Sequence, residues 1–369
     1  MTRLGDVCAI RYGKDHKKLS DGSIPAYGSG GIIRYVDTAI CEQPSVLIPR
    51  KGTLGNLFYT DEPFWTVDTL FWTDIDQTKI VPKYLYYQLK QKDLASYNVG
   101  TAVPSLTVEV LNEIDLDVPS IDKQRRIVEV LNSFDSKIAL NNQLNDYLAN
   151  LLDAAFANSA KSGSKEFGLP EVVDILSGGT PKTKNAEYWE DGRIPFFTPG
   201  DVTNSVYTLT TEKHITDVGL DNCNSELYPV DTVFLTARGT VGKVAIAGRP
   251  MAMNQSCFAF RGKSIPQSVV FQIIKNAVKT LRAKANGATF AAINTRDLKI
   301  ETVAVPCNKE IAHYDESASK WLDLIRTNEE ENLQLSALRD ILLPKLMSGE
   351  IDVSKVDLTQ LTNNHLAGC

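Results

Sequence analysis

The chain has 369 residues, of which 43% are hydrophobic and 23% are charged, and its formal net charge at pH 7 is −6. This length predicts two or three domains with cores of their own, and no apolar run approaches the roughly 20 residues that a membrane-spanning helix needs. The acidic balance argues against a uniformly basic nucleic-acid-binding surface, although acidic and basic faces can be segregated on one molecule.

The N-terminus and the cysteines predict an ordinary cytoplasmic protein. The first ten residues lack the apolar core of a secretory signal peptide. The six cysteines form no CxxC pair, and none lies near a histidine at zinc-binding spacing; they are Cys8, Cys41, Cys223, Cys257, Cys307 and Cys369. We therefore expect reduced thiols and no metal site.

The composition of residues 1–118 predicts a first domain. The segment is rich in Val, Ile, Thr, Tyr and Phe and is interrupted by Gly, Pro, Asn and Asp, a composition typical of short strands joined by turns. A helix is predicted from Tyr84 to Lys92. Near the start of the domain a predicted loop carries a basic run, formed by Lys14, His16, Lys17 and Lys18.

The spacing of apolar residues predicts a long helix over residues 119–158. Apolar side chains recur there at steps of three and four, at Ile127, Leu131, Phe134, Ile138, Leu148, Leu151 and Ala155. Such spacing over about 30 residues suggests a coiled-coil pair. The stripe is polar in its middle, at Asn141 and Asn145, which either face solvent or face asparagines of a partner helix and fix its register. Residues 159–166 are a flexible linker by composition.

The rest of the chain follows the same plan. Residues 167–305 predict a second domain of strands and turns, with a helix from Val269 to Leu281, and residues 306–347 predict a second long helix. Its stripe is formed by Tyr314, Ala318, Trp321, Ile325, Leu335, Leu338 and Leu342, with Asn328 and Asn332 in the middle. We expect this helix to end at Pro344, because proline interrupts helices, and residues 348–369 to form a tail.

The two halves are an internal repeat. At an offset of 187 positions, residues 52–55 align with 239–242, residues 100–106 with 287–293, and residues 118–119 with 305–306. Upstream the offset is smaller, since Ile24-Pro25 matches Ile194-Pro195. The second half therefore carries extra residues, which we expect in loops.

Two similar domains, each followed by a long helix, predict a pseudo-twofold object. If the helices pair antiparallel, about 30 residues give a rod of roughly 45 Å, which compares with about 34 Å for one turn of B-DNA. Such a rod suits two readers of successive major grooves on one duplex. It suits any two-headed adaptor equally well, so the architecture alone does not identify the ligand.

The ordered motifs identify a family. The second domain contains LSGGTP (176–181), YW (188–189), IPFF (194–197), PGDV (199–202), ARGTVG (237–242) and MNQ (253–255); the first contains YGSGG (27–31), PRKGTLG (49–55) and VDT (67–69). This doubled set resembles the target-recognition domains of specificity subunits of type I restriction–modification systems, over about residues 3 to 353. We therefore expect an α+β fold: two mixed α/β target-recognition domains related by pseudo-twofold symmetry and separated by two long antiparallel coiled-coil helices.

The resemblance implies a function and partners. Each domain would read one half of a split sequence in double-stranded DNA, and the helices would set the spacing and bind two methyltransferase subunits. Those subunits would hold S-adenosylmethionine and methylate adenine, and motor-nuclease subunits that use ATP and Mg²⁺ would join for restriction. The chain itself would be non-catalytic, with no cofactor or metal of its own and no membrane partner.

The paired GTxG turns supply the first candidate DNA contacts. They are flanked by Arg50, Lys51 and Thr53 in one domain and by Arg238, Thr240 and Lys243 in the other. Backbone N–H groups and cations of such a turn can contact a phosphate or a base edge. The alternative is a tight turn with solvated cations. Occurrence in both domains favours the functional interpretation, and Lys51 and Arg238 are equivalent under the offset.

Further candidates come from loops. The basic run of the first domain has a counterpart in Lys182 and Lys184. Polar residues of the glycine-rich turns that could contact base edges are Tyr27, Ser29, Thr198 and Asp201, and those of a second paired turn are Thr101, Ser105, Thr289 and Asn294. Solvated charge runs and ordinary turn chemistry explain these loop residues about as well.

Two other classes of protein compete with this interpretation. An adenine methyltransferase needs an Asn/Asp-Pro-Pro-aromatic tetrapeptide, but the sequence contains no Pro-Pro, and it lacks a GxxxxGK[ST] phosphate loop. These absences argue against an enzyme. A two-headed protein–protein adaptor without DNA contact remains the alternative, which the acidic net charge slightly favours.

Overall fold

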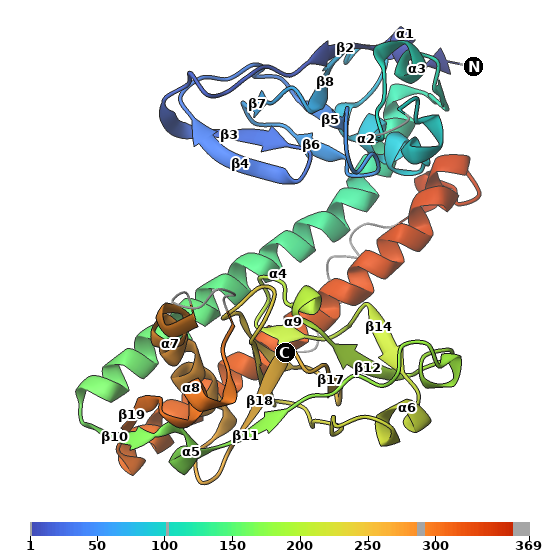
Figure 1. Ribbon diagram of the computed structural model, residues 1–369. Coiled ribbons are helices and arrows are strands. Elements are labelled where there is room, and N and C mark those ends of the chain that lie inside the picture. Colours follow the sequence, from blue (N-terminus) through green and yellow to red (C-terminus); the bar gives the residue numbers. More distant parts are fainter. Residues whose placement is uncertain (1, 101–102, 286–291, 357–369) are drawn as a thin grey trace. The chain divides into compact units, whose positions relative to one another are not determined.

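The computed structural model describes residues 2–100, 103–285 and 292–356. By contacts the chain divides into two compact units: Met1–Ser136 together with Leu335–Cys369, and Lys137–Gln334. Each unit contains one mixed α/β domain and a segment of both long helices (Figure 1). The mixed α/β class that the sequence predicts is confirmed.

The first unit is built on two sheets. The four-stranded sheet has the antiparallel order β2 (Cys8–Tyr12), β8 (Leu70–Ile75), β5 (Ser45–Pro49) and β6 (Phe58–Thr60), and the three-stranded sheet has the order β4 (Gly31–Val36), β3 (Asp21–Gly28) and β7 (Trp65–Thr66). Its other elements are β1 (Thr2–Arg3), β9 (Asp115–Leu116), α1 (Leu4–Val7), α2 (Pro82–Lys90), α3 (Val108–Asn112) and the 3-10 turns η1 (Leu94–Tyr97) and η4 (Val353–Lys355). Every residue of the central strand β5 is buried, and the buried face of α2 packs against it.

The second unit repeats this frame. Its larger sheet has the order β11 (Val173–Ser177), β18 (Cys257–Gly262), β15 (Val233–Thr236), β16 (Val244–Ala247) and β13 (Tyr207–Thr208), and its smaller sheet has the order β14 (Lys213–Ile215), β12 (Ile194–Phe197) and β17 (Ala252–Met253). The remaining elements are β10 (Ser164–Gly168), β19 (Thr302–Pro306), α5 (Leu169–Val172), α6 (Asp217–Asp221), α7 (Gln267–Ala285), α8 (Thr295–Lys299), η2 (Ala186–Tyr188) and η3 (Pro199–Asp201).

Matching hydrogen bonds confirm the internal repeat. The backbone N–H of Leu106 donates to the carbonyl of Arg50 at 3.0 Å, and at the same offset the N–H of Ile293 donates to the carbonyl of Ala237, also at 3.0 Å. The extra residues of the second half are not confined to loops, because they include β13. This strand pairs parallel with β16, so part of the insertion is bound into the sheet.

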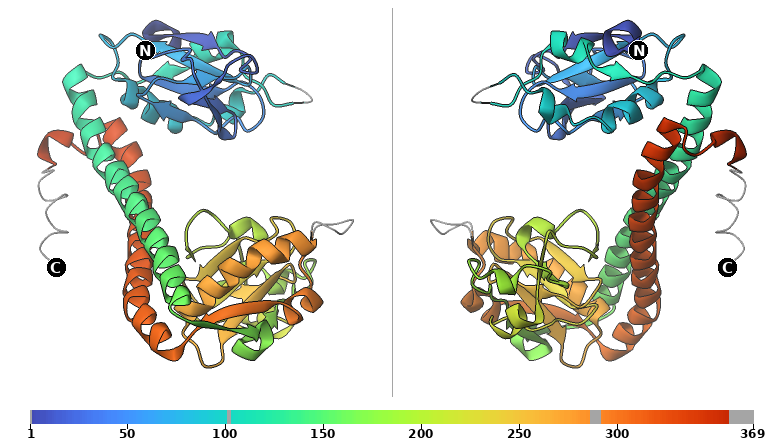
Figure 2. Two further views of the ribbon diagram at one scale, coloured as in Figure 1. Left: turned by 90° about the vertical axis from the view of Figure 1, so that its left-hand side faces the viewer. Right: turned by 90° about the vertical axis from the view of Figure 1, so that its right-hand side faces the viewer.

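The long helices are α4 (Ile121–Lys161) and α9 (Asn308–Ser348), each of 41 residues. They lie side by side in each unit (Figure 2). In the second unit Asn141 is 2% exposed and donates to Asn332 Oδ1 at 2.9 Å, while Asn145 Oδ1 accepts from Asn328 at 2.8 Å. This order of contacts is antiparallel. The interpretation in which the asparagines face one another is confirmed, and the one in which they face solvent is wrong.

Both helix ends differ from their predicted positions. Helix α4 continues to Lys161 and so includes the first three residues predicted as a linker, while the last three belong to β10, which pairs with β19 over five residues. Helix α9 passes through Pro344 to Ser348. Leu343 and Leu346 are buried in the core of the first unit on either side of this proline, so packing holds the last turn despite the missing hydrogen bond. In the described part of the chain, no helix combines the length and apolarity that crossing a membrane requires.

Candidate nucleic-acid interface

The turn that follows β5 positions the first candidate cations. Gly52 adopts φ +90°, a conformation that side-chain-bearing residues rarely adopt, and its N–H donates to the carbonyl of Pro104 at 3.1 Å. Lys51 forms a bridge with Ser105 through the backbone, which leaves its exposed side chain free to extend outward. The Arg50 guanidinium donates to the Asp68 carbonyl at 3.0 Å and lies 5.4 Å from the Tyr12 ring centroid.

Three other segments of the first unit adjoin this turn. The Asn56 side chain, at the end of the turn, donates to the carbonyl of Ser29 at 2.7 Å. The basic run connects to the turn through residues 66–69, because the Lys14 N–H donates to the carbonyl of Thr66 at 2.8 Å and the Arg50 N–H donates to the carbonyl of Thr69 at 2.9 Å. Together with the bridge to Ser105, these contacts gather the predicted loops around one turn.

The second unit has an equivalent turn after β15. Gly239 and Gly242 adopt φ +76° and +82°, and Arg238 is exposed while its N–H donates to the carbonyl of Ser256 at 3.2 Å. The Thr240 hydroxyl donates to the carbonyl of Pro199 at 3.2 Å, and Lys243 Nζ reaches the carbonyl of Val202 at 3.4 Å. The glycine-rich turn of residues 198–201 therefore adjoins the GTxG turn here, as the hairpin tip does in the first unit.

Some candidate residues hold their own loops. Both Asp201 carboxylate oxygens accept hydrogen bonds, Oδ2 from the Thr198 N–H and hydroxyl at 2.7 Å each and Oδ1 from the Glu212 N–H at 2.8 Å. Asn294 caps α8 by accepting from the Asp297 N–H at 3.0 Å. The Tyr27 ring packs beside Phe58, and burial raises the pKa of its hydroxyl.

The basic loops are open to solvent. Lys14, Lys17 and Lys18 are exposed, as are Lys182 and Lys184, whereas His16 is half-buried and its Nδ1 has no hydrogen-bond partner among the described residues. Within residues 2–100, 103–285 and 292–356, none of these lysines forms an ion pair, and neither does Lys51, Arg238 or Lys243. Their charges are therefore available to an anionic ligand. Thr101 and Thr289 lie outside the described residues.

Sequence reasoning did not single out three exposed apolar residues of the first unit, Tyr12, Ile32 and Ile33. The Tyr12 ring lies against the Arg50 guanidinium, and the isoleucines follow the hairpin tip that Asn56 of the turn contacts. The adjacent isoleucines interrupt the alternation of buried and exposed positions expected in a half-buried strand, and this interruption was the available signal.

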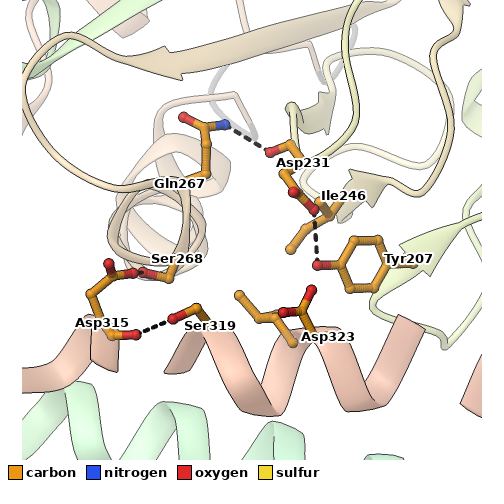
Figure 3. Close-up of a pocket in the computed structure, with 9 residues that line it drawn as sticks. Tyr207, Asp231, Ile246, Gln267, Ser268, Asp315, Ser319 and Asp323 are labelled. Atoms are coloured by element: carbon orange, nitrogen blue, oxygen red, sulfur yellow. Dashed lines mark hydrogen bonds between the residues drawn. The ribbon is translucent and has the colours of Figure 1, made fainter. Parts of the chain in front are cut away.

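A pocket of the second unit, of about 150 Å³, is lined by acidic side chains, in contrast to the cationic turns (Figure 3). Its polar walls include Asp231, Asp315 and Asp323. The first accepts from the Tyr207 hydroxyl at 3.0 Å, and the second accepts from the Ser268 hydroxyl at 2.5 Å. Such an acidic lining does not suit a phosphate. In the described ranges, no group of three or more His, Cys, Asp or Glu side chains is arranged to hold a metal ion.

Comparisons with known proteins agree with these features. Residues 1–150 and 161–334 match the family model described as type I restriction modification DNA specificity domain. The chain is 30% identical over 172 residues to the type I restriction enzyme MjaIX specificity subunit of Methanocaldococcus jannaschii, a match that covers 44% of this chain and 39% of that relative. It is 22% identical over 396 residues to the HindI specificity subunit of Haemophilus influenzae, covering 82% and 85% of the two chains.

A solved structure shares the fold. The crystal structure of the S subunit of a type I restriction–modification system from M. genitalium superposes with a TM-score of 0.58 at 17% sequence identity, over 94% of this chain and 95% of that one.

Proposed function

Because the chain belongs to the type I restriction–modification DNA specificity family, we propose that it reads a bipartite target in double-stranded DNA, one half-site with each domain. The observation that carries the proposal is the doubled turn. In both units a glycine at positive φ follows an exposed cation, Lys51 or Arg238, that is free of ion pairs among the described residues. The two turns also share the matching hydrogen bonds of the repeat.

The chemistry of the turn suits DNA. A lysine ammonium neutralises a phosphate as a point charge, while an arginine guanidinium can bind a phosphate or the O6/N7 edge of guanine with two hydrogen bonds. The neighbouring lysines of the basic loops add contacts to the phosphate backbone, which position the protein without specifying sequence. Local basic faces of this kind are compatible with a net charge of −6 for the whole chain.

The long helices are the proposed scaffold for partner subunits. Leu140, Leu144 and Tyr147 of α4 recur at helical spacing and are all exposed, and an exposed apolar stripe of this kind marks a protein interface. We assign it to a methyltransferase subunit that holds S-adenosylmethionine, with motor-nuclease subunits that use ATP and Mg²⁺ joining the complex. The chain itself contributes recognition and spacing and carries no catalytic group.

A methylation map tests the proposal. The chain is co-expressed with its neighbouring methyltransferase subunit, and the host DNA is sequenced for modified adenine. A split motif with a fixed unspecific gap, absent when this chain is omitted, is the expected result. Absence of modification, together with a complex that has no DNA affinity at low salt, would contradict the proposal and favour the two-headed adaptor.

A further inference from the structure

The hairpin of β3 and β4 is an open, two-stranded ribbon. Gly28 pairs with Gly31 across the two-residue tip Ser29-Gly30, and β4 is an edge strand of its sheet. A Cβ placed at Gly30 or Gly31 would meet no atom within 4 Å. The tip is therefore unobstructed within the described structure.

The ribbon carries two exposed isoleucines immediately after its tip. Ile32 is 48% exposed and Ile33 is 50% exposed. The register of the strand pair shifts between Ala26 and Tyr27, so that Ile33 has no partner on β3. A bulge of this kind adds one residue to a strand and re-aims its side chains, which explains why two consecutive apolar residues both remain at the surface.

The apolar pair adjoins the cationic turn. Asn56 holds the hairpin tip through its hydrogen bond to the Ser29 carbonyl, and Ser29 Oγ lies 3.9 Å from the Cβ position of Gly52. Lys51, exposed and without an ion pair among the described residues, precedes this glycine. The ligand of this surface must therefore combine negative charge with small apolar groups. Duplex DNA does so in its major groove, where the thymine 5-methyl group lies between phosphate-lined walls.

We propose that the β3–β4 hairpin of the first domain enters the major groove and that Ile32 and Ile33 contact the 5-methyl group of a thymine in the first half-site. The major groove is wide enough for a two-stranded ribbon. The cations of the turn contact the phosphates beside it, and the isoleucines distinguish thymine by its methyl group. This inference rests on the proposed function and adds the residues that set one base of the target.

The second domain lacks this feature. Lys213 pairs with Phe196 in the second domain as Arg34 pairs with Ala26 in the first. The two residues that precede Lys213, Thr211 and Glu212, therefore occupy the positions of the two isoleucines. The Thr211 hydroxyl is engaged with the Phe196 N–H at 3.1 Å. Recognition of thymine methyl groups by this hairpin is thus specific to the first domain.

The test uses the assembled complex and its mapped target. Each thymine of the first half-site is replaced in turn by deoxyuridine, which lacks only the methyl group, and affinity is measured by titration. We expect at least one replacement to weaken wild-type binding about fourfold, the value for one buried methyl group. The double variant Ile32→Ala/Ile33→Ala should bind thymine and deoxyuridine targets equally, while Ile300→Ala, an exposed isoleucine of the second domain, should retain the wild-type ratio.

Several outcomes would overturn the inference. These are a first half-site without thymine, wild-type affinity that is indifferent to every deoxyuridine, or an unchanged ratio in the double variant. Dissociation of the methyltransferase subunit from the double variant in gel filtration would instead assign the hairpin to a protein interface. The wild-type measurement does not depend on how the variant folds. Specific methylation without a deoxyuridine effect would contradict this inference alone. Absence of specific methylation would contradict the proposed function.

Discussion

The two domains place the same turn on the same frame of strands but surround it with different side chains. In the first domain Lys51 lies beside a hairpin that exposes Ile32 and Ile33. In the second domain Arg238 lies beside a loop that Asp201 holds through three hydrogen bonds. The frame of strands therefore fixes the position of the turn in both domains, while the short loops around it differ in the side chains that they present.

The extra strand β13 is a second difference. Among the described residues the first domain has no counterpart of this strand. Glu329 of α9 accepts hydrogen bonds from the backbone of Val206 and Tyr207 beside it. At the repeat offset the position of Glu329 corresponds to Asn142 of α4, which is exposed. The insertion is thus anchored by a buried carboxyl group, at a position where the first repeat has an exposed amide.

Exchanging one domain should have the largest effect. Replacing residues 1–118 by the same region of a relative should change the whole first half-site and leave the second unchanged, because each domain has its own core and its own turn. Methylation mapping measures both half-sites at once. Changes in both would show that the domains do not recognise DNA independently.

Lengthening the helices should alter the gap between half-sites without altering either of them. Four residues inserted into α4 after Ser136 and into α9 after Gln334, where the two units divide, add about 6 Å of helix. We expect a gap that is longer by one or two base pairs, at roughly 3.4 Å each. The same four residues inserted at Gly163, outside both helices, serve as the control. A methylation map with the original gap would contradict the spacing role.

Removing the paired cations should weaken binding more moderately. Lys51→Ala and Arg238→Ala should each reduce affinity about tenfold, since one charged contact is worth roughly 1–3 kcal/mol. The slope of log affinity against log salt should decrease by about one for each phosphate that the variant no longer neutralises. Arg125→Ala, an exposed cation of α4, is the matched control. Unchanged affinity across a salt series would remove either residue from the DNA-binding surface.

The last predicted effect is a pH dependence of the stability of the second unit, which leaves DNA recognition unchanged. Burial raises the pKa of Glu329 from 4.5 to about 7. The folded state therefore binds a proton that the unfolded state releases, and stability should fall as the pH rises from about 4.5 to 7. Glu329→Gln should remove this pH-dependent decrease and stabilise the chain at pH 8 by about 1–3 kcal/mol. Thermal melts at pH 5 and pH 8 measure it, with Asn142→Gln as the control; a variant as sensitive to pH as the wild type would refute this assignment.

The sequence predicted the parts of the site that depend on local chemistry. A glycine after a cation, repeated at a fixed offset, was sufficient to identify Lys51 and Arg238 as equivalent. The spacing of apolar residues predicted both long helices, because helical periodicity is a property of the chain itself. The sequence also contains the signal for helix capping by Asn294, because the capping box needs only an acidic residue three positions later, here Asp297.

Only the tertiary structure decided which side chains those local elements leave free. Three features depend on partners distant in the sequence. They are the asparagines that face one another, the strand β10 that begins within the predicted linker, and the helix that continues through Pro344. The same holds for the half-buried Tyr27 ring, which packs against the core, and for the isoleucines, which a register shift leaves at the surface. Periodicity determines which faces a segment has, but packing between distant segments determines which of those faces is covered.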